Sequence, residues 1–156
     1  MYDRIVVPLD GSDLASEALV HGKNLAKRLD VPIHLVRAID PTVFSGGMGA
    51  IGMGFDYTAV NELISEEEQD ATSFIDTQVA ALTSEGYTAT GVVLRGTAAT
   101  AIISATKDGD LVTMASHGRT GVRRWFLGSV AEEVLRQATV PVLLIRMPHE
   151  DEEKRH

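Results

Sequence analysis

Glycines and arginines gather in residues 114–129, MASHGRTGVRRWFLGS, although the chain as a whole is acidic, with a formal net charge of −8. Arginine guanidinium groups bind phosphate oxygens strongly, and glycines let a ligand approach the backbone closely. Gly128-Ser129 precedes apolar residues at helical spacing, and a helix N-terminus presents unpaired N–H groups that suit phosphate. The stretch therefore predicts a phosphate site, with Arg119, Arg123 and Arg124 available to neutralise charge.

The same stretch also allows an interpretation without a ligand. Gly118 and Gly128 could simply shape turns, and the arginines could be solvated. The Ser129 hydroxyl could cap the following helix or contact an anion. Physical reasoning on these residues alone leaves both interpretations open. We interpret Trp125-Phe126-Leu127 as packing residues and not as a surface for stacking bases.

Composition narrows the classes of partner and cofactor. The 156 residues suit one domain, and the negative charge argues against nucleic acid or a membrane surface as partner. The absence of cysteine excludes disulfides and thiolate metal sites, and the five histidines lack metal-ligand spacing. No apolar run is long enough to span a bilayer, and the start of the chain does not resemble a signal peptide. A cytoplasmic location is expected.

Strand-like and helix-like segments alternate along the chain. This order predicts a single doubly wound α/β domain, Rossmann-like, with a five-stranded parallel sheet in the order 3-2-1-4-5 and helices on both faces. The domain is expected to cover residues 1–147, followed by a charged, disordered tail at 148–156, and residues 42–56 are expected to form a Gly/Met-rich loop. The predicted strands are residues 4–9, 33–39, 88–94, 110–115 and 141–146. The predicted helices are residues 14–29, 57–85 and 97–106, and a last helix that begins at residue 128 or 129 and ends near 137.

A doubly wound sheet binds ligands beyond the carboxyl ends of its strands, where the winding reverses. The candidate turns are those after the first and fourth strands, Asp10-Gly11 and residues 115–118. Asp10 could also cap the first helix. Residues 47–52 match G-x-G-x-x-G, but they lie well past the end of the second predicted strand, and no acidic residue stands at the end of a following strand about 20 positions on. We therefore do not interpret them as a dinucleotide fingerprint.

The glycine spacing resembles the signature of the universal stress protein family in its ATP-binding branch, which is Gly, two residues, Gly, nine residues, then Gly followed by Ser or Thr. Gly118, Gly128 and Ser129 match it, and Ala115 replaces the first glycine. The segments IVVPLDGS, LVRAID and GSVAEEVLRQATVPVLLIR also resemble family elements. The resemblance covers essentially the whole chain except the Gly/Met-rich loop and the tail.

The resemblance implies an ATP-binding stress-response or signalling module, with Mg²⁺ or Mn²⁺ bound through the phosphates and a homodimer formed through residues 142–145. The protein partner is not implied, nor is the choice between ATP, AMP and cyclic AMP. Occupancy of the site is expected to order the neighbouring loops. By position, the implied adenine and ribose contacts are Pro8, Leu9, Asp10, Ala38, Met114 and Ala115, and the implied phosphate contacts are His117, Gly118, Arg119, Gly128, Ser129 and Val130.

Two other functions stay open. A slow ATP hydrolase would use the same pocket, although no residue is identified that would activate water. A dimeric interaction protein without nucleotide is the second, and Ala115 is the feature that points to it. On the residues alone, His117 could be a turn histidine, and Ala38 and Met114 could be core.

Overall fold

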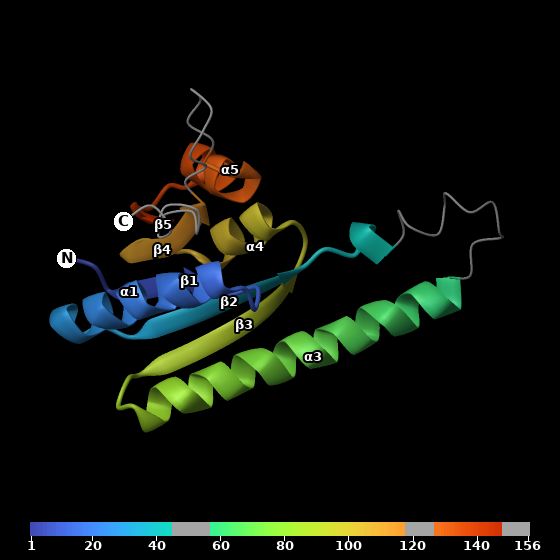
Figure 1. The fold of residues 1–156 in the computed structure, drawn as a ribbon, viewed down its shortest axis with the longest axis horizontal. Coiled ribbons are helices and arrows are strands. Elements are labelled where there is room, and N and C mark those ends of the chain that lie inside the picture. Colours follow the sequence, from blue (N-terminus) through green and yellow to red (C-terminus); the bar gives the residue numbers. More distant parts are fainter. Residues whose placement is uncertain (45–56, 118–126, 148–156) are drawn as a thin grey trace, which may run out of the picture.

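A five-stranded parallel sheet forms the centre of the molecule, in the order β3-β2-β1-β4-β5 (Figure 1). The computed structural model describes residues 1–44, 57–117 and 127–147. This order and the alternation of strands and helices confirm the predicted fold class. The strands are β1 Arg4–Pro8, β2 Ile33–Ile39, β3 Ala89–Arg95, β4 Asp110–His117 and β5 Val142–Met147, and the helices are α1 Asp13–Leu29, α3 Tyr57–Ser84, α4 Ala98–Ala105 and α5 Ser129–Gln137.

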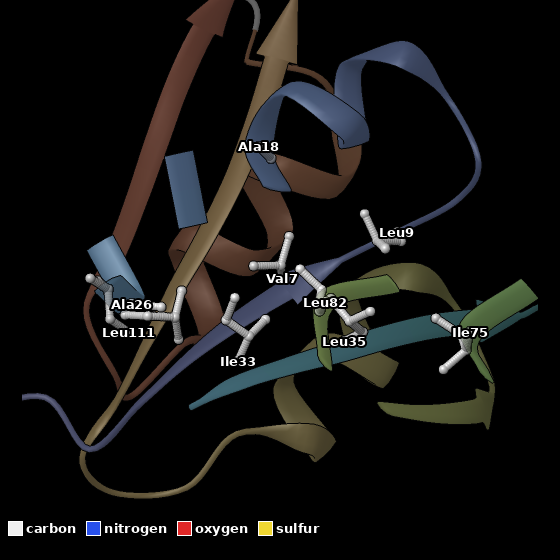
Figure 2. Close-up of a cluster of buried hydrophobic side chains, with 10 residues drawn as sticks. Val7, Leu9, Ala18, Ala26, Ile33, Leu35, Ile75, Leu82 and Leu111 are labelled. Carbon is white, nitrogen blue, oxygen red and sulfur yellow. The ribbon is translucent and has the colours of Figure 1, made fainter. Parts of the chain in front are cut away.

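Helices cover both faces of the sheet because alternate strand residues point to opposite sides. On one face, β1 contributes Ile5 and Val7 to a cluster with residues of α1 and α3, part of which Figure 2 shows. On the other face, Val6 packs with residues of α4 and α5. The winding therefore reverses between β1 and β4, as the sequence predicted.

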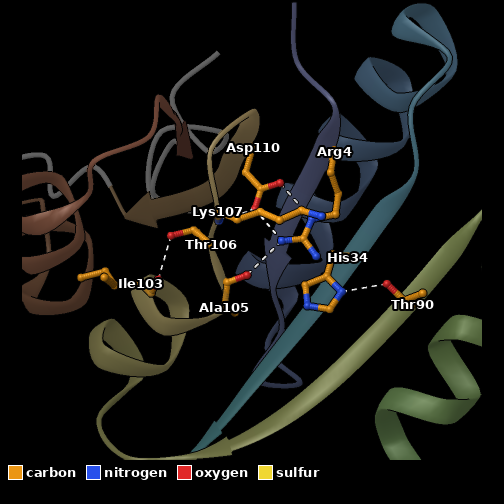
Figure 3. Close-up of polar contacts among 8 residues, drawn as sticks. All are labelled: Arg4, His34, Thr90, Ile103, Ala105, Thr106, Lys107 and Asp110. Carbon is orange, nitrogen blue, oxygen red and sulfur yellow. Dashed lines mark hydrogen bonds and ion pairs between the residues drawn. The ribbon is translucent and has the colours of Figure 1, made fainter.

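The amino end of the β1–β4 seam is closed by a buried ion pair (Figure 3). Arg4 donates to the fully buried Asp110 carboxylate at 2.9 and 2.5 Å, and to the Ala105 carbonyl at 3.0 Å. The Lys107 N–H also donates to Asp110, at 2.9 Å. Burial alone would raise the pKa of Asp110, but the hydrogen bonds from Arg4 and Lys107 lower it overall.

Most strand and helix bounds lie within one residue of the predicted ones, and two larger differences stand out. β4 extends to His117 because it stays paired with β5 as far as Met147. Residues 42–44, predicted as loop, are helical. The Asp40 carboxylate accepts from Thr42 N at 3.0 Å and caps that turn.

Residues 45–56 and the tail, about which the sequence also made predictions, lie outside the described residues. Among the residues that are described, no helix is long and apolar enough to cross a membrane.

Candidate functional site

A cavity of about 560 Å³ opens at the carboxyl ends of β1, β2 and β4, at the point where the winding reverses. This volume is typical of pockets that bind small ligands. Among the residues predicted for the site, the cavity is lined by Pro8, Leu9, Asp10, Ala38, Met114, Ala115, Gly128, Ser129 and Val130. Of His117 the structure describes only the backbone, at the end of β4, and Gly118, Arg119, Arg123 and Arg124 lie outside the described residues.

One wall of the cavity is apolar. Val36 and Ala38 of β2 and Met114 of β4 form its sheet side, and Ala98 and Ile102 of α4 face them. Such a wall suits a flat, weakly polar group such as a nucleobase. Sequence reasoning gave neither Ala98 nor Ile102 a place in the site, because helical spacing shows which face of a helix is apolar but not that a cavity borders it.

Asp10 follows β1 and organises the turn into α1. Its Oδ1 accepts from Ser12 N at 2.9 Å and from Ser12 Oγ at 2.6 Å, and Ser12 Oγ in turn accepts from Ala15 N at 3.2 Å. Ser12 is therefore the N-cap of α1, and the alternative that Asp10 caps this helix is wrong. The Asp10 side chain is exposed and lines the cavity.

The electrostatics of the turn keep Asp10 charged. Partial burial raises the pKa of the Asp10 carboxyl, but the Ser12 hydrogen bonds, a hydrogen bond from the Asp10 backbone and, least of these, the positive charge of Arg37 together lower it. At neutral pH the group is a carboxylate, which accepts hydrogen bonds and donates none. It can accept from the hydroxyl groups of a bound ligand.

The N-terminus of α5 borders the cavity without a side-chain cap. Its N-cap is Gly128, with φ of 81°, a conformation that favours glycine, and no side chain there bonds the helix. The hydrogen bonds of the helix begin with Glu132 N to Gly128 O at 3.0 Å, so the preceding N–H groups have no partner within the helix. By contrast, Ser12 caps α1 and Thr97 caps α4. The alternative that Ser129 caps α5 is not supported, since Ser129 is its first residue.

Ala115 borders the cavity, but its side chain packs against the cluster under α1 and α3. The neighbouring Met114 packs on the opposite face, with the residues of α4 and α5. The methyl group that distinguishes Ala115 from glycine is therefore directed away from the N-terminus of α5. Alanine in place of the signature glycine therefore does not fill the space in front of that helix end.

The described residues contain no cluster of three or more histidine, aspartate or glutamate side chains that could hold a metal ion. They therefore offer no metal cage built from the protein alone.

The chain is similar to known proteins over nearly its whole length. The sequence model of the universal stress protein family matches residues 1–146. Universal stress protein MJ0531 of Methanocaldococcus jannaschii is 34% identical over 154 residues, which are 97% of this chain and 86% of that protein.

Two solved structures share the fold. The structure of MJ0577, also from Methanocaldococcus jannaschii, is 25% identical with a TM-score of 0.75, and the match covers 96% of this chain and 99% of that one. A universal stress protein from Archaeoglobus fulgidus in complex with dAMP is 22% identical with a TM-score of 0.60, and the match covers 92% and 98% of the two chains.

Proposed function

The chain belongs to the universal stress protein family, and from this premise we propose that it binds ATP in the cavity at the carboxyl ends of β1, β2 and β4. The family resemblance found in the sequence is thereby confirmed, whereas the ligand is a proposal. A relative was solved with dAMP, which supports an adenine nucleotide as the class of ligand.

The uncapped N-terminus of α5 carries the proposal. Its first N–H groups, which have no partner within the helix, and its partial positive charge border a cavity large enough for a nucleotide. The phosphates would lie against Gly128, Ser129 and Val130, whose backbones can donate to them. His117, Gly118 and Arg119 are proposed as further phosphate contacts, on the family signature alone.

The base and the ribose take the remaining part of the cavity. The base would lie on the apolar wall near Ala38 and Met114, and the ribose hydroxyls would donate to Asp10. Pro8, Leu9 and Ala115 complete the lining beside the ribose. The cavity thus brings together an apolar wall, a carboxylate and a helix N-terminus, the three kinds of group that a nucleotide would use.

A divalent cation, Mg²⁺ or Mn²⁺, is proposed to bind with the nucleotide. The described residues supply no cluster of metal ligands, so the phosphate oxygens would be its main ligands. The cation would neutralise phosphate charge next to a chain of net charge −8.

We further propose that the protein is a nucleotide-dependent stress-response module that acts as a homodimer. β5 is an edge strand, and Leu143 on it is 38% exposed. An exposed strand edge is commonly covered by pairing. The protein partner is not identified, and the cytoplasmic location stays a prediction.

Nucleotide content and affinity test the proposal. Small molecules released by heat from the purified protein are identified by mass, and ATP, ADP and AMP are then titrated by calorimetry with and without Mg²⁺. We expect one ATP per chain, bound more tightly with Mg²⁺. A protein that arrives empty and binds none of these nucleotides would refute ATP binding and favour the nucleotide-free interaction protein.

A further inference from the structure

We propose that Arg37 of β2 is a positioning residue for Asp10. It supports the turn that carries Asp10 and connects this turn to α3. The proposal rests on the proposed function, that the cavity binds a ribonucleotide. Arg37 does not line the cavity. It would therefore act on a ligand through Asp10 and not by contact. Neither the glycine signature nor the spacing of apolar residues singled out this arginine.

The side chain of Arg37 lies on the sheet face that α1 and α3 cover. Leu35, two residues earlier on β2, belongs to the cluster on that face, whereas Val36 belongs to the other. A Cβ built on Gly11 would lie 3.6 Å from one guanidinium nitrogen of Arg37. Arg37 is thus packed under the turn that carries Asp10, and its side chain is only 19% exposed.

Two groups of α3 fix the guanidinium from the other side. The Phe74 ring centroid lies 5.0 Å from the Arg37 Cζ atom, within cation–π range. The Glu67 carboxylate lies at 3.4 Å, the long end of a hydrogen bond. Within the described part of the chain this is the one contact between Glu67 and Arg37, and the positive charge of Arg37 still acts on Asp10.

That charge acts on the carboxylate proposed to bind the ribose. Asp10 uses Oδ1 to hold Ser12, and the Arg37 charge helps Asp10 remain an anion. Without Arg37, the turn would lose its support under Gly11, and Asp10 would lose a nearby cation. A ligand without ribose hydroxyls would not register the change in Asp10, because it donates nothing to that carboxylate.

A second arginine provides a matched control. Arg95, at the carboxyl end of the neighbouring strand β3, pairs in two bonds with Glu68, the residue after Glu67 on α3. It therefore also ties a strand to α3 through a glutamate. It is 62% exposed and is not among the groups that act on Asp10.

The experiment compares ATP with 2′,3′-dideoxy-ATP, which lacks both ribose hydroxyls, by calorimetry on wild type, Arg37→Gln, Arg37→Lys and Arg95→Gln. In Arg37→Gln we expect ATP affinity to fall about fivefold or more, the scale of one charge-assisted hydrogen bond, while dideoxy-ATP affinity changes less than about twofold. Arg37→Lys, which restores the charge, should recover most of the loss. Arg95→Gln should bind both nucleotides as wild type does.

The experiment separates failure of the Arg37 proposal from failure of the proposed ATP binding. Equal weakening of both nucleotides in Arg37→Gln, or no weakening of either, would overturn the positioning role while leaving ATP binding intact. Wild-type protein that binds neither nucleotide would overturn the proposed function and the role of Arg37 with it. If Arg37→Gln does not fold, Arg37→Lys decides the question. A preference for ATP over 2′,3′-dideoxy-ATP as strong as in wild type supports the role of the charge. Loss of that preference overturns it.

Discussion

The two ends of the β1–β4 seam use charged residues in opposite ways. At the amino end, the fully buried Asp110 receives three hydrogen bonds, two from Arg4 and one from Lys107 N. At the carboxyl end, the exposed Asp10 uses one oxygen within its own turn and faces a cavity of about 560 Å³. The same two strands thus carry one carboxylate that stabilises the fold and another that is free for a ligand.

The contrast has a physical cause. A buried carboxylate must be paired and hydrogen-bonded, because it has lost its water. An exposed carboxylate keeps its water until a ligand replaces it. Changes at the amino end should therefore alter stability but not nucleotide binding, and changes at the carboxyl end should do the reverse.

The largest effect is expected from Asp110→Asn. The substitution leaves the Arg4 guanidinium, 16% exposed, without its anion. We expect the free energy of unfolding to fall by about 3 kcal/mol, on the scale of breaking a buried ion pair, while the folded fraction keeps its ATP affinity. Urea unfolding and calorimetry measure the two. Glu68→Gln, which breaks an exposed pair with Arg95, is the control and should cost little.

Ala38→Leu, at the carboxyl end of the sheet, is expected to weaken ATP binding but to leave stability nearly unchanged. Ala38 lies on the apolar wall of the cavity, and a larger side chain would occupy the place proposed for the base. We expect ATP affinity to fall about tenfold or more, with the free energy of unfolding changed by less than about 1.5 kcal/mol. Ala80→Leu, on the exposed side of α3, adds the same atoms away from the cavity. Unchanged ATP affinity in Ala38→Leu would mean that the base does not lie on this wall.

Ala115→Gly restores the glycine of the family signature and should have a smaller effect. The methyl group packs on the α1 side of the sheet, so its removal should change ATP affinity by less than about twofold and should cost about 0.5–1 kcal/mol of stability, as glycine in a strand does. Calorimetry and urea unfolding measure these values. A clear gain in affinity would instead mean that the methyl group crowds the ligand.

The smallest effect concerns His34, whose Nδ1 lies 2.8 Å from Thr90 Oγ1 beside the Arg4–Asp110 pair (Figure 3). Burial, and then the positive charge of Arg4, lower the pKa of His34 below its ordinary value of 6.5. Between 6.5 and that lowered value the unfolded chain binds a proton that the folded chain does not, so stability falls as the pH decreases.

Replacing His34 should therefore flatten the dependence of stability on pH below 6.5. Urea unfolding of wild type and His34→Asn at several pH values between 7 and 5 measures the slope. His21→Asn, at an exposed position of α1, controls for the loss of a histidine as such. An equal slope in wild type and His34→Asn would contradict the lowered pKa.

Sequence reasoning located the main elements because they depend on local patterns, and the family resemblance pointed to half of the residues that line the cavity. The β-branched run at Ile5–Val7 and the helical spacing after Ser12 predict elements that the structure contains. The turn residues Asp10 and Gly128 were found because strand ends in a doubly wound fold meet at one edge. The element bounds were inexact where pairing decides them, as for β4, which continues to His117.

Contacts between distant segments were not predictable in this way. Arg4 and Asp110 are separated by 106 positions, and nothing in either local sequence indicates that they pair. The same is true of Arg37, which reaches α3 and the Asp10 turn at once, and of Ala98, which borders the cavity from α4.

By itself, the sequence determined which segments are strands or helices and where the winding reverses. These properties follow from side-chain periodicity and backbone preferences, which act over a few residues. Only the tertiary structure decided that Ser12 and not Asp10 caps α1, that the Ala115 methyl group turns away from α5, and that Asp110 is paired while Asp10 is left open. Those outcomes depend on how several elements pack against one another, since packing sets which polar groups lose their water and which keep it.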